Sequence, residues 1–337
     1  MSRYAVITGT GRYVPDTIDT NAMLKQRLAP DLAKVVDAFE ESSGIHQRRL
    51  APREWAASDL AVCAAQAALD KAGLRPEQVD MILLGTDTPD YITPATSTVV
   101  QHKLGAVNAG TFDIGCACAS FPTGIATAAG LLTANPWMQH VLVVGVYLMS
   151  KLVATDDVTQ FFYSDGAGAA VVSAAQQPGV LASAYLADGQ YHDYWGLYAG
   201  ATSEPATIEA VQAGHTNVRL LQRYPPDVNH INWPRIVRTL AERGSFAVTD
   251  LDLVIFTQVR LPSIKLVMAD LGLPLEKTHW VMDNWGYTGS ACIGMALDDA
   301  IACGKVKPGA LVALVGSGVG YNYAGVALRM SPTAALW

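Results

Sequence analysis

The chain has 337 residues, half of them hydrophobic and only 16% charged, which predicts one large core or two fused halves and excludes a disordered or coiled-coil protein. The net charge is −7 and the lysines and arginines form no cluster, so we expect no nucleic-acid binding. The sequence has neither an uninterrupted apolar run of about 18 residues nor a signal-peptide pattern, so we expect no membrane insertion and no export.

The cysteines also predict a cytoplasmic protein. Their number is odd and their spacing forms no disulfide framework, which predicts reduced thiols in a cytoplasmic protein. The five are Cys63, Cys116, Cys118, Cys292 and Cys303. The C-x-C pair has no second pair and no histidine nearby, so we expect no metal and no bound cofactor.

The N-terminus predicts a strand over residues 4–8, followed by the segment GTGRYVP. Gly9 and Gly11 resemble the start of a dinucleotide-binding loop. The third glycine of that loop is missing, and Pro15 would interrupt the helix that must follow. We therefore reject nucleotide binding at this end of the chain.

The next elements alternate between helices and buried strands. Apolar spacing predicts helices at 21–26, 32–41, 58–73 and 96–104, and strands at 47–50, 79–85, 139–145 and, after a glycine turn, 165–172. Residues 176–216 read as an irregular loop region, and 211–232 show no clear period. A helix at 233–243 precedes another buried strand, LDLVIFT.

Residues 111–126, TFDIGCACASFPTGIA, are the stretch around which the chain is organised. A short strand breaks at Gly115, two thiols follow, and small apolar residues continue at helical spacing. A thiol at such a junction lies near the positive end of a helix dipole, which favours the thiolate. We therefore expect Cys118 to act as a nucleophile.

The second half of the sequence repeats the first. Three pairs of landmarks share nearly one offset: Asp80 and Asp252 are 172 positions apart, Asp113 and Asp283 are 170 apart, and Gly145 and Gly316 are 171 apart. This predicts two similar α/β halves, residues 1–175 and 176–337, packed about a pseudo-two-fold axis. Cys118 should then face the equivalent junction at 287–290.

Motifs along nearly the whole chain resemble the ketoacyl-synthase III type of the thiolase superfamily. They are GTGRYVP, SSGIHQRR, FDIGCACASF, YSDGAGAAVV and KVKPGALVALVGSGVGYNYAG. The resemblance implies a layered αβαβα fold, a homodimer and an acylated Cys118. It places a small residue where this chain has Cys116, for which we expect a structural role.

The chain departs from the family at two catalytic positions. The resemblance places a histidine where this chain has Thr257 and an asparagine where it has Tyr287. Neither replacement carries positive charge or acts as a base near neutral pH. Two interpretations of Tyr287 stay open: it fills the space vacated by the missing pair, or its hydroxyl orients an acceptor.

The positions that bind coenzyme A in relatives also differ. A tryptophan and an arginine are replaced by Ala38 and Ser42, and a further arginine by Asp157. We therefore expect an acyl carrier protein, rather than coenzyme A, as the usual donor. Its phosphopantetheine arm would enter as part of the substrate.

Acylation of Cys118 needs neither of the lost residues. Its own N–H and an N–H of the 318–320 turn, with Val319 and Gly320, are expected to bind the oxyanion. His192 is a candidate replacement base, although an exposed loop histidine is the simpler interpretation. We read the other six histidines as surface or structural residues.

Three functions remain compatible with the sequence. The first is acyl transfer from a carrier, through Cys118, to a nucleophilic acceptor in natural-product, polyketide-type biosynthesis. The second is a decarboxylative condensing enzyme with a rebuilt site, in which the loss of a charged donor pair would cost several powers of ten, since a single donor is worth about 100- to 1000-fold. The third is a non-catalytic partner subunit of a heteromeric synthase.

Overall fold

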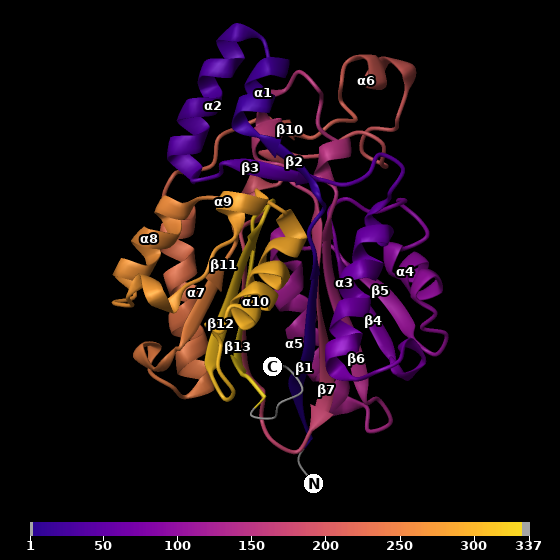
Figure 1. The fold of residues 1–337 in the computed structure, drawn as a ribbon, viewed down its shortest axis with the longest axis vertical. Helices are drawn as coiled ribbons and strands as arrows, with labels where there is room; N and C mark the ends of the chain where they lie inside the picture. Colours follow the sequence, from indigo (N-terminus) through magenta and orange to yellow (C-terminus); the bar gives the residue numbers. More distant parts are fainter. Residues whose placement is uncertain (1–2, 332–337) are drawn as a thin grey trace.

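Two mixed β-sheets frame the computed structural model, which describes residues 3–331 (Figure 1). The strand order in the first sheet is β1 (Tyr4–Tyr13), β7 (Gly166–Ala175), β6 (His140–Tyr147), β4 (Met81–Gly85) and β5 (Gly110–Ile114). In the second sheet it is β11 (Leu253–Phe256), β12 (Leu311–Gly318), β13 (Asn322–Arg329) and β8 (Val180–Ala187). In the first sheet β5, β4 and β6 are parallel to one another, and β7 pairs antiparallel with β6. In the second sheet β11 and β12 are parallel, and β13 pairs antiparallel with β12.

The helices complete a five-layer arrangement, αβαβα, as the resemblance implies (Figure 1). The outer layer on the first sheet is α3 (Ala57–Ala72) and α4 (Thr96–Leu104). The central layer, between the sheets, is α5 (Ser120–Ala134) and α10 (Cys292–Ala302). The outer layer on the second sheet is α7 (Val228–Gly244) and α8 (Leu261–Asp270).

The burial of the central layer explains its composition. Every strand residue of β12 is buried, and α10 is buried along almost its whole length, which requires a helix that is apolar on all sides. The segment Ala117–Ala134 is apolar and long enough to cross a membrane, but 56% of it is buried inside the protein. We interpret it as a core helix.

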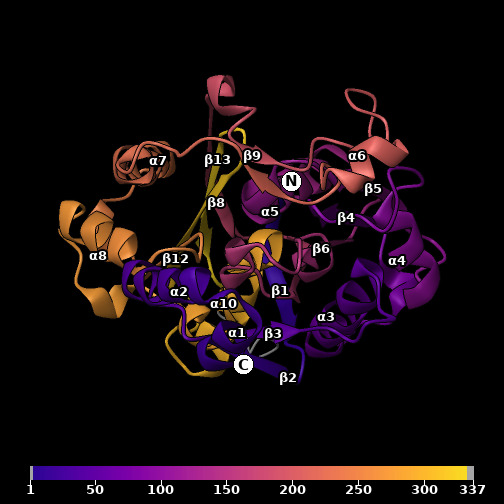
Figure 2. The same ribbon diagram turned by 90° about the horizontal axis from the view of Figure 1, so that it is seen from above.

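Smaller elements cover one end of the layers (Figure 2). They are β2 (Thr17–Thr20), α1 (Asn21–Arg27), α2 (Pro30–Ser43), β3 (Gln47–Leu50), β9 (Trp195–Gly196), α6 (Ile208–Gln212), β10 (Arg219–Leu220) and α9 (Met282–Trp285). Short 3-10 turns are η1 (Pro76–Gln78), η2 (Ala117–Ala119), η3 (Met149–Lys151), η4 (Val158–Phe161), η5 (Gly189–Tyr191), η6 (Val248–Asp250), η7 (Leu275–Lys277) and η8 (Gly289–Ala291).

The first strand is longer than the sequence predicts. Instead of ending near residue 8, β1 continues through the GTGRY segment and pairs with β7 as far as Tyr13, with a bulge between Ile7 and Gly9. A Cβ on Gly9 would lie 2.3 Å from the carbonyl oxygen of Ala68 in α3. These glycines therefore allow a helix to pack closely on the strand, and no nucleotide loop forms.

The prediction of an irregular region at 176–216 is wrong in part. Residues Val180–Ala187 form β8, the edge strand of the second sheet, and pair antiparallel with β13. Most residues of β8 are only half-buried, so they lack the apolar run that marks the central strands. The prediction holds for most of the segment after β8, which contains only short elements.

The repeat is visible in the sheets. In the first half, β4 runs parallel to β6, and β6 runs antiparallel to β7. In the second half, β11, β12 and β13 have the same order and the same directions. The two central turns meet at the middle of the molecule, because η2 packs on β12 and η8 packs on β6.

Candidate active site

Cys118 lies in η2, the turn that links β5 to α5. Its side chain is only 2% exposed. The preceding residue, Ala117, has φ +46°, a conformation that L-amino acids other than asparagine and aspartate rarely adopt. Such strain is typical of positions where a fold fixes a reactive side chain.

The second half of the chain holds this turn in place. A Cβ on Gly318, at the end of β12, would lie 2.2 Å from the carbonyl oxygen of Cys116 and 3.1 Å from the amide nitrogen of Cys118. Only glycine allows this approach. The backbone at the start of the 318–320 turn therefore lies against the nucleophile, at the place where we expect an oxyanion to bind.

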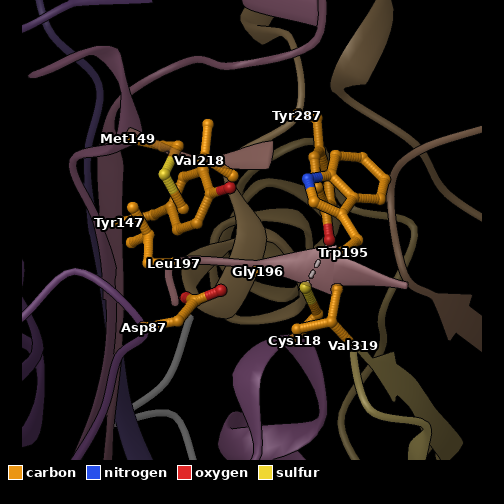
Figure 3. Close-up of a pocket in the computed structure, with 10 residues that line it drawn as sticks. All are labelled: Asp87, Cys118, Tyr147, Met149, Trp195, Gly196, Leu197, Val218, Tyr287 and Val319. Carbon is orange, nitrogen blue, oxygen red and sulfur yellow. Dashed lines mark hydrogen bonds between the residues drawn. The ribbon is translucent and has the colours of Figure 1, made fainter. Parts of the chain in front are cut away.

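Tyr287 is the side chain that the structure brings to the thiol. Its hydroxyl forms a hydrogen bond with Cys118 Sγ (Figure 3). Its N–H donates to the carbonyl of Phe162 (3.0 Å) and its carbonyl accepts from Ser164 N–H (2.9 Å). The backbone of Tyr287 is thus held on both sides, and the residue is buried beside the sulfur. The predicted meeting of Cys118 with the 287–290 junction is confirmed.

A cavity of about 210 Å³ opens beside the sulfur (Figure 3). Its walls are mostly apolar, and its polar groups come from one carboxylate, two phenols and the thiol. The lining residues are Asp87, Cys118, Tyr147, Met149, Trp195, Gly196, Leu197, Val218, Tyr287 and Val319. They come from both halves, so the cavity lies between the two repeats.

Burial opposes the thiolate that the sequence leads us to expect at the helix start. Burial raises the pKa of Cys118 well above its usual value, and the nearby Asp87 and Cys292 raise it further. The hydrogen bond from Tyr287 lowers it but does not offset the burial. The loss of hydration destabilises the thiolate more than the dipole of a short helical turn stabilises it. Burial thus favours the thiol form of Cys118, and its acylation calls for a proton acceptor.

Thr257 lies near the site but does not contact the sulfur. It is buried at the end of β11, and its hydroxyl accepts a hydrogen bond from Ser317 N–H (2.9 Å). With Tyr287 and Asn229 it lines a second, smaller cavity of about 50 Å³. The hydroxyl is thus engaged by the backbone of β12.

The other predicted residues are separated. Cys116 lines a separate groove and does not line the Cys118 cavity. His192 is exposed and lines neither of the two cavities that hold Thr257 and Cys118. Val319 lines both cavities, and Gly320 has φ +115°. An oxyanion role for the amides of Cys118, Val319 and Gly320 stays a prediction.

Sequence reasoning missed Asp87 and Tyr147. Asp87 follows β4 by two residues and lines the cavity, where burial raises its pKa. Tyr147 ends β6, and its ring centroid lies 5.9 Å from that of Tyr287. A carboxylate just after a buried strand is a recognisable signal, because ligands bind at the carboxyl ends of parallel strands.

One group of side chains in the described part of the chain has the donor types of a metal site. The ligand atoms of His279, Asp299 and Cys303 lie within 4.8 Å of one another. However, Asp299 pairs with His279 (2.8 Å) and with Arg12 (3.1 Å), and the hydrogen bond from His279, followed by the Arg12 charge, holds the pKa of this carboxyl below its usual range. We interpret the group as an ion-pair cluster.

Comparison with known sequences identifies the family of the chain. Residues 112–189 match the family model for 3-oxoacyl-[acyl-carrier-protein] synthase III, and residues 241–330 match the model for its C-terminal part. The beta-ketoacyl-[acyl-carrier-protein] synthase III of Caldanaerobacter subterraneus subsp. tengcongensis is 35% identical over 97% of this chain and 98% of its own length.

Solved structures agree with this assignment. The 3-oxoacyl-[acyl-carrier-protein] synthase III of Aquifex aeolicus VF5 superposes with a TM-score of 0.84 at 29% identity, covering 96% of this chain and 99% of that one. The priming beta-ketosynthase of the R1128 polyketide biosynthetic pathway superposes with a TM-score of 0.87 at 27% identity, covering 98% of this chain and 97% of that one. The chain therefore has the thiolase fold and belongs to the ketoacyl-synthase III family.

Proposed function

We propose that the protein is an acyltransferase that forms an acyl-Cys118 thioester and passes the acyl group to a nucleophilic acceptor. The donor is an acyl carrier protein or coenzyme A, and the setting is polyketide-type natural-product biosynthesis in the cytoplasm. One observation carries the proposal: among the residues that line the two cavities at Cys118 and Thr257, none is a histidine, lysine or arginine.

That absence bears on the choice between transfer and condensation. Decarboxylation of a malonyl thioester produces an enolate, which a condensing enzyme must stabilise with strong donors. Here the Thr257 hydroxyl accepts a hydrogen bond from Ser317 N–H, and Tyr287 is an uncharged donor. Acyl transfer to an amine, thiol or hydroxyl forms no enolate, so it makes a smaller demand on this site.

The cavity also indicates the acyl group. Pockets for drug-sized ligands usually measure about 300–1,000 Å³, and this one is smaller, at about 210 Å³. Met149, Leu197 and Val218 supply an apolar wall. A short acyl group fits this space.

The test is intact-protein mass spectrometry after incubation with a panel of acyl carrier protein and coenzyme A thioesters. We expect a mass increase equal to the acyl group in the wild type and in Cys116→Ser, and none in Cys118→Ala. No adduct with any donor would contradict the proposal. Unchanged pathway output with Cys118→Ala would favour the non-catalytic subunit.

A second assay separates transfer from condensation. The acylated protein is mixed with a malonyl thioester, and carbon dioxide is measured. Release of carbon dioxide that depends on Cys118 would identify a condensing enzyme with a rebuilt site. We expect no release above the level given by Cys118→Ala.

The active assembly is proposed to be a homodimer, as the resemblance implies. The exposed side chain of Phe112 on β5, the edge strand of the first sheet, is consistent with a partner surface there. Sedimentation of the purified protein tests this point.

A further inference from the structure

We propose that Asp87 is the residue that accepts and returns the proton during acyl transfer at Cys118. The inference rests on the proposed function. It assigns to Asp87 the proton transfer for which the cavity has no histidine. It follows from the position of the carboxylate, from how that position is held, and from the proton balance of the reaction.

The carboxylate faces the reacting atoms. Asp87 lines the same cavity as Cys118, and Figure 3 shows its oxygens directed into the space between the sulfur and Tyr147. Ser290 Oγ donates a hydrogen bond to Oδ1 at 2.7 Å. Ser290 is the only side chain among the described residues that hydrogen-bonds this carboxylate, so Oδ2 is available to a substrate.

The loop that carries Asp87 is fixed on both sides. Its neighbours Thr86 and Thr88 are buried, and their hydroxyls lie 3.2 Å apart. Thr88 Oγ1 also accepts a hydrogen bond from Leu148 N–H (2.9 Å), which ties the loop to the segment after β6. Ser290 belongs to the second half of the chain. The first half thus holds the loop and the second half bonds the carboxylate, which preorganises the group for proton transfer.

The alternatives in the cavity cannot accept a proton. A phenol is a weak acid with a pKa of about 10, and burial raises the pKa of Tyr147 and of Tyr287 well above that value, so neither phenolate is available as a base. Asp87 is the only carboxylate among the residues that line the two cavities. Burial also raises its pKa, so this carboxyl binds a proton more readily than a carboxyl in water, and its ionised form is the stronger base.

The first half-reaction balances through this group. The Cys118 thiol gives its proton to the Asp87 carboxylate as the sulfur attacks the carbonyl carbon of the donor thioester. The tetrahedral intermediate then breaks its bond to the donor sulfur. Asp87 returns the proton to that sulfur, so the products are acyl-Cys118 and a free carrier thiol.

The second half-reaction repeats these steps with the acceptor. Asp87 takes a proton from the attacking hydroxyl or amine as a new C–O or C–N bond forms. The bond between the acyl carbon and Cys118 Sγ breaks. The proton passes from Asp87 to the sulfur, which restores the thiol and needs no oxidant, reductant or metal.

The experiment compares two acceptors with different needs for a base. The protein is loaded with an acetyl group from acetyl-pantetheine or, for slow variants, from p-nitrophenyl acetate, and loss of the acyl group is followed by mass spectrometry. Neutral ethanol is a weak nucleophile unless a base removes its proton during the attack, whereas hydroxylamine attacks readily as the neutral molecule. We expect Asp87→Asn to slow transfer to ethanol by about 10²- to 10⁴-fold and transfer to hydroxylamine by less than about tenfold.

A matched control lies in the same loop. Asp90 accepts a hydrogen bond from Ser58 N–H and does not line the Cys118 cavity. Asp90→Asn is expected to keep both rates. Ethanol transfer by Asp87→Asn within threefold of the wild type, or equal losses with both acceptors, would overturn the role of Asp87.

A second variant covers the case in which Asp87→Asn does not load. Asp87→Ala is assayed with and without added formate, a small carboxylate that can occupy the vacated space. We expect formate to raise the rate of loading or of ethanol transfer at least tenfold. No recovery in a variant that melts at the wild-type temperature refutes the inference. A wild type that never loads would instead refute the proposed function.

Discussion

The hydrogen bond between Tyr287 and Cys118 predicts a measurable loss of thiol reactivity in Tyr287→Phe. The hydroxyl lowers the pKa of Cys118 by donating to the thiolate, so its removal raises that pKa further. A hydrogen bond to a charged group is worth about 1.5–3 kcal/mol, which corresponds to about 1–2 pKa units.

The expected change in rate is smaller than the change in thiolate fraction. Below the pKa, each unit lowers the thiolate fraction about tenfold, while the remaining thiolate becomes more nucleophilic, with a Brønsted coefficient of about 0.4–0.5. The two effects together predict alkylation about 4- to 20-fold slower at a fixed pH. The assay is the rate of iodoacetamide labelling of Cys118, with peptide mass spectrometry to separate it from the other four cysteines.

Tyr147→Phe is the matched control, because it removes a hydroxyl from the same cavity without removing a hydrogen bond to Cys118. We expect its labelling rate to stay within about twofold of the wild type, since substitutions away from a direct interaction are usually small in effect. If Tyr287→Phe is labelled as fast as the wild type, the hydroxyl does not activate the thiol. The interpretation of Tyr287 as a space-filling ring would then be correct.

Two further predictions concern stability. Arg48 is buried, and its guanidinium donates to the Asp19 side chain (3.0 Å) and to Asn21 Oδ1 (2.8 Å). Arg48→Ala leaves the Asp19 charge without this partner and should lower the free energy of unfolding, measured with urea, by about 3–5 kcal/mol. A loss below about 1 kcal/mol would contradict this prediction. Burial raises the pKa of Asp165 to about 6, above its value in an unfolded chain. The stability that protonated Asp165 contributes is therefore complete below about pH 4 and is lost as pH rises to about 6, a change of about 3 kcal/mol. Asp165→Asn should gain stability relative to the wild type across this interval, and parallel pH profiles would refute the assignment.

The parts of the fold that the sequence predicts are those governed by burial along a local segment. The strands at Met81–Gly85, His140–Tyr147 and Leu311–Gly318 are continuous apolar runs, and the structure buries almost every residue in them. The common offset between the two halves then predicts that Cys118 faces the 287–290 junction. This follows because duplicated halves must present equivalent turns to each other.

The features that the sequence does not predict depend on contacts between distant segments. The half-exposed edge strand Val180–Ala187 forms because β13 offers a partner, and its own residues carry little signal. Asp87 and Asp90 are aspartates in the same short loop, so the sequence alone does not distinguish their roles. Only the folded chain directs Asp87 to Ser290 and into the cavity, while Asp90 caps the start of α3. The raised pKa of Cys118 likewise depends on how deeply the sulfur is buried.

The repeat offers two equivalent loops from which a proton acceptor can reach the site, as the proposed role of Asp87 requires. The resemblance places the histidine of the family at Thr257, on the loop after β11. The strand that corresponds to β11 in the first half is β4, and the loop after β4 carries Asp87. Both loops follow the parallel strand next to the central β6 or β12. Asp87 and Thr257 line two cavities that share Tyr287 and Val319. A proton acceptor on either loop can therefore act on the same sulfur, and Cys118 need not move when the acceptor changes from one half to the other.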